Sequence, residues 1–290
     1  MPDAARKTIS ATEAPALWNA SPYLTRWMLY RRFRDGVNVD SEPNVRMDWG
    51  LKLQPLILAQ AASDLKLEVS PNDGDVYHRR GLLGCTRDGD IISPDQGPGA
   101  IETKCVFDYR DWMDKWGGGE FVPRHYEIQH QVQMMVGDGL EPFRWGVIAA
   151  WVAGEVHYFN RQPIPELQTE LEKEAVSFFA SVKDGNEPDP FGHPIEMPFL
   201  SALERVSGKV VKLDDDKLAQ AARAYAEAGE IISAGNKRRE EIKAQLLAAA
   251  GDAETLQLPL GVTVSVKRQT RSAYEVKPST FAVVKVRMTE

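Results

Sequence analysis

The stretch "GCTRDGDIISPDQGPGAIETKCV", residues 84–106, decides which fold the sequence favours. Two short runs of β-type residues flank a turn rich in Gly, Pro and Asp, and this pattern predicts a β-hairpin. The second run, residues 100–106, is apolar except at Glu102 and Lys104. Because side chains alternate along a strand, these two charges share one face. If the sheet is covered on both sides, they must be paired or must point into a cleft.

Asp88 lies across the predicted turn from Glu102. Two carboxylates that converge there would hold a hard cation, helped by a backbone carbonyl such as that of Thr103. Mg²⁺ or Mn²⁺ in such a place lowers the pKa of a bound water and neutralises charge on a phosphodiester. Lys104 would then orient or deprotonate the water, or stabilise the phosphate. On these residues alone, a solvated strand face beside an ordinary Asp-Gly turn is the more common explanation.

A second pattern lies in "HYEIQHQVQMMVGDG", residues 125–139, which predicts a helix. Tyr126, Gln129 and Gln133 recur at helical spacing, and the two glutamines share a face because they are four residues apart. Amides suit a buried stripe only when they hydrogen-bond something. Beside a metal cleft, such a helix would hold the attacking water, or phosphate and sugar groups. A solvated polar helix face is the alternative.

Composition limits the broad class. Of the 290 residues, 43% are hydrophobic and 27% are charged, as in an ordinary soluble globular protein. No apolar run approaches the roughly 20 residues of a membrane span, and the N-terminus lacks a signal-peptide core. Cys85 and Cys105 have neither metal-type spacing nor the pattern of a disulfide framework, so we expect a reducing, cytoplasmic compartment. The net charge of −7 gives no overall basic field.

Local charge is uneven, however. Residues 256–290 carry a balance of +4, and residues 22–34 interleave four arginines with aromatic side chains. Basic groups among aromatics suit a phosphate-rich polymer. For residues 22–34 a buried aromatic stripe under a solvated helix face is the favoured interpretation.

The order of predicted elements indicates an α/β core over residues 1–200 and an appendage over residues 201–290. The core is a mixed central sheet flanked by helices, and one of its hairpins turns at Ala153-Gly154. The predicted core helices are residues 10–21, 21–33, 44–65, 124–139 and 164–185, and the strands lie within 65–70, 76–93, 100–109 and 145–161. In the appendage we expect one or two long helices over 214–251, then basic β-hairpins over 258–276 and 281–288.

Five short motifs in order resemble one nuclease family over residues 6–185. They are "ISATEAP" (9–15), "MDWGLKLQP" (47–55), "CTRDG" (85–89), "IETKCV" (101–106) and "YEIQHQVQ" (126–133). Together they resemble the lambda exonuclease-like branch of the PD-(D/E)xK nucleases, also called YqaJ-type viral recombinases. The resemblance implies a restriction-endonuclease-like fold and Mg²⁺- or Mn²⁺-dependent cleavage of DNA.

The resemblance also implies a biological setting. It implies 5′ to 3′ digestion of duplex DNA ends by a ring of three subunits, in phage-type recombination within a bacterial host cell. A single-strand-annealing recombination protein is the expected partner, and no membrane is involved.

Carried over residue by residue, the resemblance makes Asp88 and Glu102 metal ligands, with the Thr103 carbonyl as the remaining ligand that the protein supplies. Lys104 becomes the catalytic lysine, and Tyr126 and Gln129 become supporting residues of the helix. Three residues correspond to positions where relatives contact the terminal 5′ phosphate: Arg6, which needs a one-residue gap, Thr12 and Thr86.

Two departures leave alternatives open. Gln54 replaces the family's acid before Pro, and a neutral amide is a weaker Mg²⁺ ligand at a second metal position. The chain is then alternatively a nuclease-like DNA-binding or assembly module with weakened catalysis, or a branched-DNA or single-strand nuclease of the same fold. Pro94-Asp95 also gives a literal Pro-Asp string before Glu102, but Asp88 is preferred because Asp95 falls in the predicted turn.

Overall fold

The computed structural model describes residues 8–36, 44–72, 76–202, 206–268, 284 and 286. The chain divides into two compact units, Met1–Pro198 and Phe199–Glu290. All candidate site residues lie in the first unit, where Arg6 falls outside the described residues.

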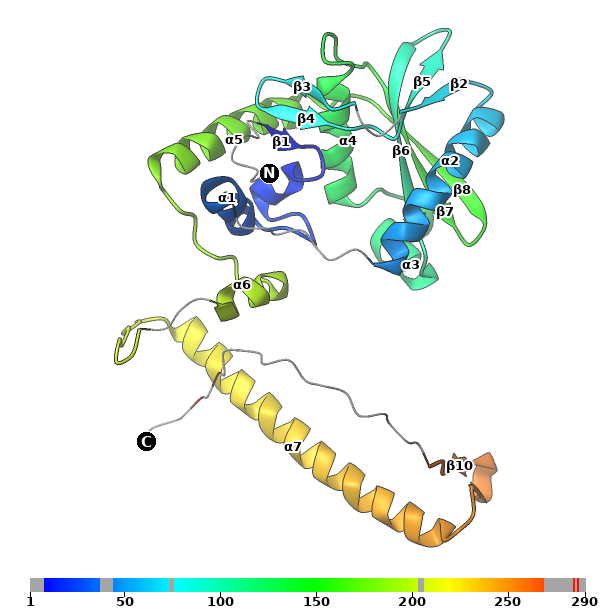
Figure 1. The fold of residues 1–290 in the computed structure, drawn as a ribbon, viewed down its shortest axis with the longest axis vertical. Helices are drawn as coiled ribbons and strands as arrows, with labels where there is room; N and C mark the ends of the chain where they lie inside the picture. The colour runs from blue at the N-terminus through cyan, green and yellow to red at the C-terminus, as the bar shows by residue number, and fades with distance from the viewer. Residues whose placement is uncertain are drawn as a thin grey trace. The chain divides into compact units, whose positions relative to one another are not determined.

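The first unit is built on a five-stranded sheet in the order β2-β5-β6-β7-β8 (Figure 1). Its central strands β6 and β7 are parallel, and the other neighbours are antiparallel. The predicted mixed sheet is therefore confirmed, including the β7–β8 hairpin, which turns at Ala153 and Gly154 with positive φ at both. The strands are Glu68–Pro71 (β2), Gly89–Ser93 (β5), Gly97–Val106 (β6), Gly146–Val152 (β7) and Glu155–Arg161 (β8).

Helices cover both faces of this sheet. On one face α2 (Val45–Leu65) packs Ile57 and Leu58 against Ile101 and Ala149. On the opposite face, Trp112 and Trp116 of α3 (Tyr109–Trp116) pack against Ile148, Ala150 and Val152. Helix α4 (Arg124–Val136) packs on β6 and β7. Strand β7 is apolar throughout because both of its faces are buried.

The helix α3 was not predicted. It is only eight residues long and turns just two tryptophans inward, so its periodicity is too short to detect in the sequence. Its start is set by Asp108, whose carboxylate accepts a hydrogen bond from the Arg110 N–H. Its placement matters because Trp116 packs on Tyr126 of α4, with ring centroids 5.6 Å apart.

A smaller sheet brings the N-terminal motif to the hairpin. Strand β1 (Ile9–Ser10) pairs in parallel with β4 (Leu83–Cys85), which pairs with β3 (His78–Arg80). The predicted N-terminal helix is a 3₁₀ helix over Ala14–Trp18 (η2). This pairing sets residues 10–13 beside residues 84–88, although about 70 positions separate them in the sequence.

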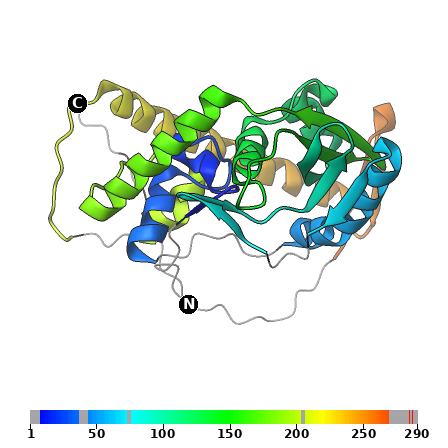
Figure 2. The ribbon, with the colours of Figure 1, turned by 90° about the horizontal axis from the view of Figure 1, so that it is seen from above.

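Helix α1 (Arg26–Asp35) lies alongside α5 (Pro165–Asp184), as Figures 1 and 2 show. It buries Trp27, Met28 and Tyr30, which confirms the buried aromatic stripe for these residues, whereas Tyr23 is exposed and Arg32 is buried. Phe33 continues the packing by meeting Phe178 of α5 edge to face at 5.6 Å. Two short elements follow α5, the 3₁₀ helix Pro194–Glu196 (η4) and Met197–Ala202 (α6).

The second unit is dominated by one exposed 35-residue helix, Asp216–Ala250 (α7). An antiparallel pair follows, Thr255–Gln257 (β9) and Thr263–Ser265 (β10), joined through the 3₁₀ helix Pro259–Gly261 (η5). The sequence thus predicted the helix, but it placed the first hairpin over 258–276, whereas the structure pairs β10 with β9, which precedes that range. The strand expected over 281–288 lies outside the described residues. Across the part of the chain that the structure describes, we find no helix with the length and apolarity that a membrane span requires.

Candidate active site

The site forms where β6 runs on beyond the end of β5. The ladder between these strands ends at the pair Gly89–Ile101. In the described parts of the chain, no strand covers this edge of β6 beyond Ile101. Asp88 takes that place: its Oδ2 accepts hydrogen bonds from the Thr103 N–H at 2.7 Å and from Thr103 Oγ1 at 2.6 Å. In an extended strand the N–H and C=O of one residue point to the same side, so the Thr103 carbonyl also faces Asp88.

Glu102 and Lys104 share the face of β6 that looks toward α4, as their alternation predicts. Glu102 is only 4% exposed. Its Oε1 accepts hydrogen bonds from Lys104 Nζ and, at 2.6 Å, from Gln129 Nε2, while its Oε2 accepts one from Gln133 Nε2 at 2.6 Å. Lys104 Nζ also donates to Gln129 Oε1 at 3.2 Å. The two glutamines therefore form a buried hydrogen-bonded stripe rather than a solvated helix face.

Six of the predicted residues line one cavity of about 440 Å³. Ser10, Glu13, Arg32 and Tyr77 contribute to the same wall. The predicted residues that the cavity brings together are Thr12, Thr86, Asp88, Glu102, Lys104 and Gln129. Motifs from three separate parts of the sequence thus converge on one place.

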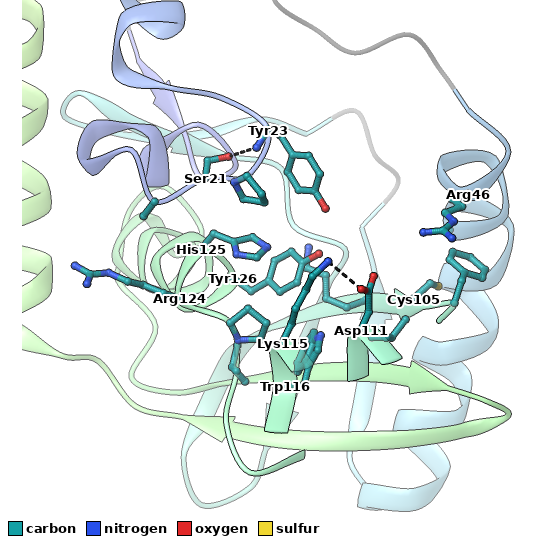
Figure 3. A pocket seen from close by; sticks show the side chains of 18 of the residues that line it. Ser21, Tyr23, Arg46, Cys105, Asp111, Lys115, Trp116, Arg124, His125 and Tyr126 are labelled. Carbon is teal, nitrogen blue, oxygen red and sulfur yellow. Dashed lines mark hydrogen bonds and ion pairs between the residues drawn. The ribbon is translucent and has the colours of Figure 1, made fainter. Parts of the chain in front are cut away.

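A larger cleft of about 1070 Å³ adjoins this cavity and includes Lys104 in its lining. Tyr126 lines the larger cleft, with Lys104 Nζ 4.6 Å from the centre of its ring. Figure 3 shows Tyr23, Lys115, His125 and Tyr126 around this cleft, with Lys115 paired to Asp111. Aromatic rings interleaved with cations are suited to nucleic acid.

Two other predicted positions, Asp95 and Gln54, lie elsewhere. Asp95 sits in the turn at the opposite end of the β5–β6 hairpin, where its N–H meets Ser93 Oγ, so it cannot join Glu102. Gln54 is half-buried on α2 and is not part of the lining of the 440 Å³ cavity. Arg6 lies outside the described residues.

The electrostatics of the cavity favour a cation. Burial, and next the charge of Glu102, raise the pKa of Asp88 to about 6. Burial on its own would lower the pKa of Lys104, but the carboxylates of Glu102 and Asp88 outweigh it, so the pKa of the ammonium lies above its ordinary value. Burial and then Lys104 lower the pKa of His125 to about 4, so this ring is neutral at physiological pH.

The donor set fits Mg²⁺ or Mn²⁺ better than a transition metal held by soft ligands. Asp88, Glu102 and the Thr103 carbonyl offer oxygen only, and Mg²⁺ binds through one or two carboxylates while keeping several waters. Glu102 has lone pairs to spare because an ionised carboxylate accepts about four hydrogen bonds. Within the described residues there is no group of three or more His, Cys, Asp or Glu side chains placed to hold a metal.

Some residues of the site were not predicted. Glu13 was not predicted as a site residue, yet its buried carboxylate accepts hydrogen bonds from the Ser10 N–H and, at 2.5 Å, from Arg32 of α1. The Ser-x-x-Glu spacing did indicate the first contact, since it is a capping box. No local signal indicates Arg32, which is 19 residues away. His130, considered below, was also not predicted, although it lies only three residues from its partner Gln133.

Residues 3–139 match the family model of the YqaJ-like viral recombinase domain. This match confirms the resemblance, and the matched segment contains all of the site residues from Ser10 to Gln133. No curated protein matches the chain.

Several solved nuclease structures are similar at a low level. An alkaline exonuclease (LHK-Exo) from Laribacter hongkongensis is 19% identical, with a TM-score of 0.49 over 63% of this chain and 91% of that one. The structure of LHK-Exo in complex with dAMP is also 19% identical, with a TM-score of 0.48 over 63% of this chain and 92% of that one. A phage related exonuclease from Haemophilus somnus 129PT is 15% identical, with a TM-score of 0.45 over 62% of this chain and 94% of that one. At this distance, residue roles must be argued from this chain itself.

Proposed function

We propose that this protein is a Mg²⁺-dependent deoxyribonuclease that digests duplex DNA from its ends, from 5′ to 3′, in phage-type recombination. The observation that carries the proposal is the meeting of Asp88, Glu102 and Lys104 in one cavity. The family of residues 3–139 supports DNA as the substrate. A ring of three subunits and a single-strand-annealing partner, which the resemblance implies, are parts of the proposal.

The residues divide the chemistry between them. Asp88, Glu102 and the Thr103 carbonyl would hold the cation, which when bound supplies a Lewis acid for the scissile phosphate and a more acidic water. Lys104 carries three N–H donors, of which two meet Glu102 and Gln129. The third is left to donate to a phosphate oxygen or to the attacking water, and the Tyr126 ring limits where Nζ can lie.

Thr12 and Thr86 suit the terminal 5′ phosphate. Both are exposed and both line the cavity that contains Lys104. Thr12 Oγ1 is held by Ser10 Oγ at 3.2 Å, which keeps a hydroxyl directed at the wall of the cavity. Hydroxyl donors at one end of the cavity and a cation at the other would accept the last nucleotide of a 5′ end and favour 5′ to 3′ digestion.

One observation supports the second candidate, a DNA-binding or assembly module with weakened catalysis. Gln54 stands where the family has an acid, and among the described residues that line the cavity the only carboxylate besides Asp88 and Glu102 is that of Glu13, which is engaged by Arg32. A single cation is therefore the arrangement that this chain supports.

The decisive experiment follows an end-labelled duplex on a gel, with and without Mg²⁺, for the wild type and Lys104→Ala. We expect the wild type to release labelled mononucleotide from a 5′-phosphorylated end only with the metal. Lys104→Ala should lose at least about 100-fold in rate, the usual effect of deleting one donor to the reacting group, while still binding DNA.

Lys173→Ala is the matched control, because Lys173 is an exposed lysine of α5 that pairs with Glu170. It should digest DNA like the wild type. Digestion by Lys104→Ala at the wild-type rate would reject the proposal, and binding without digestion by the wild type at every metal concentration would establish the second candidate.

A further inference from the structure

Behind Glu102, α4 carries a second row of buried polar side chains. Gln133 and His130 are both 0% exposed. Gln133 Nε2 donates to Glu102 Oε2 at 2.6 Å, and His130 Nδ1 lies 2.9 Å from Gln133 Oε1. A chain of two hydrogen bonds therefore runs from the helix interior to the carboxylate.

The direction of these hydrogen bonds follows from the atoms. A carbonyl oxygen only accepts, so His130 must carry its proton on Nδ1 and donate to Gln133. Gln133 then has its NH₂ directed at Glu102. With the amide turned over, its oxygen would face a carboxylate oxygen at hydrogen-bond distance, which is repulsive.

The other ring nitrogen of His130 has no hydrogen-bond partner among the described residues, although it is buried. An unpaired buried acceptor costs stability, so retaining one in the core needs a reason. Its place is also set by β7: a Cβ on Gly146 would overlap His130 Nε2 and would lie 2.8 Å from the Ala100 carbonyl oxygen. The ring occupies a space that only glycine at residue 146 leaves open.

The two oxygens of Glu102 are thus held separately. Oε1 is bound by Gln129 and Lys104 within the cavity wall, whereas Oε2 is bound from behind by Gln133. Fixing both oxygens determines the plane of the carboxylate, and with it the direction of the lone pairs that face Asp88.

We propose that His130 and Gln133 are positioning residues that hold the Glu102 carboxylate in the orientation that a divalent cation requires. This inference rests on the proposed function, because it takes Glu102 as a metal ligand. It predicts that removing either hydrogen bond between His130, Gln133 and Glu102 weakens cation binding even when no DNA is present.

The test is Mn²⁺ binding by metal-free full-length protein, followed by the loss of the free Mn²⁺ signal in electron paramagnetic resonance. His130→Leu and Gln133→Leu should each weaken Mn²⁺ affinity by about 10–100-fold, the usual effect of removing a group that orients a ligand. His130→Asn should stay within about threefold of the wild type, because its amide can donate from the place of Nδ1.

Gln131→Leu is the matched control. Gln131 is an equally buried amide of α4, but it bonds Glu127 and the Gln162 carbonyl and does not touch Glu102. This variant should lower the melting temperature without changing Mn²⁺ affinity.

The outcomes separate the two proposals. A wild type that binds no Mn²⁺ overturns the proposed function and this inference with it. A wild type that binds Mn²⁺, with leucine variants that fold and bind it equally well, overturns the inference alone. Leucine variants that lose native near-ultraviolet circular dichroism, without recovery in His130→Asn, would assign His130 a structural role and also overturn it.

Discussion

Replacing Asp88 by asparagine should make the metal-free protein more stable while abolishing its activity. The carboxylate is half-buried close to Glu102, and burial and that charge raise its pKa to about 6 from 3.8. Asparagine removes the charge but keeps an oxygen to accept the hydrogen bonds from the Thr103 N–H and Oγ1.

The expected gain in the free energy of unfolding follows from the pKa shift of Asp88. About two pKa units correspond to about 3 kcal/mol at most, and because Asp88 is partly exposed we expect roughly 1–3 kcal/mol. For a unit of this size, that is a rise in melting temperature of roughly 2–10 °C. The wild type binds a proton more tightly when folded than when unfolded, so it loses stability as the pH rises from about 4 through about 6. The advantage of Asp88→Asn should therefore be near zero at pH 4 and complete by pH 7.

The assay is urea unfolding of both proteins in EDTA at several pH values between 4 and 8. Mg²⁺ should then stabilise the wild type but much less the variant, because only a folded site binds it. Asp95→Asn, in the turn of the same hairpin, serves as the control and should follow the wild type in stability, pH dependence and activity. Equal pH dependence for the wild type and Asp88→Asn would refute the like-charge repulsion at the centre of this reasoning.

Two further substitutions test the surroundings of the site. Gln54→Glu should change the rate of DNA digestion by no more than about threefold, because Gln54 does not line the cavity. The rate is measured on the same end-labelled duplex, and a gain of tenfold or more would instead show a decayed second metal position. Gly146→Ala should destabilise the protein by about 1–3 kcal/mol or more in urea unfolding, because its Cβ would overlap His130 and press on the Ala100 carbonyl. Wild-type stability of that variant would mean that β7 and α4 pack less tightly than the structure shows.

The parts of the fold that the sequence predicted are those with a local repeat. The alternation that puts Glu102 and Lys104 on one face of β6, and the four-residue spacing of Gln129 and Gln133, depend only on strand and helix geometry. The β7–β8 hairpin was equally accessible, since two β-type runs meet at the turn Ala153-Gly154, where both residues have positive φ.

What the sequence could not supply is the set of contacts made across long separations. The pairing of Ile9 with Leu83 brings Thr12 to Thr86, and it involves two short strands with no periodicity of their own. The hydrogen bond between Arg32 and Glu13 joins two helical segments whose charges each resemble an ordinary solvated face. For Thr12 and Thr86 the motif match, rather than the physics of the segments, indicated that the residues belong together, whereas no motif included Arg32.

The charge of the centre explains why such a costly arrangement persists. In their ordinary ionisation states Asp88, Glu102 and Lys104 sum to −1 in a place that is largely removed from water. Under the proposed function, a divalent cation would change that sum to +1 and a phosphodiester would return it to zero, so metal and DNA would each improve the binding of the other. A protein selected for stability alone would replace one of the two carboxylates, since burying an unbalanced charge is among the most expensive features of a core. Keeping both carboxylates is consistent with a site whose net charge is balanced by bound ligands during the reaction.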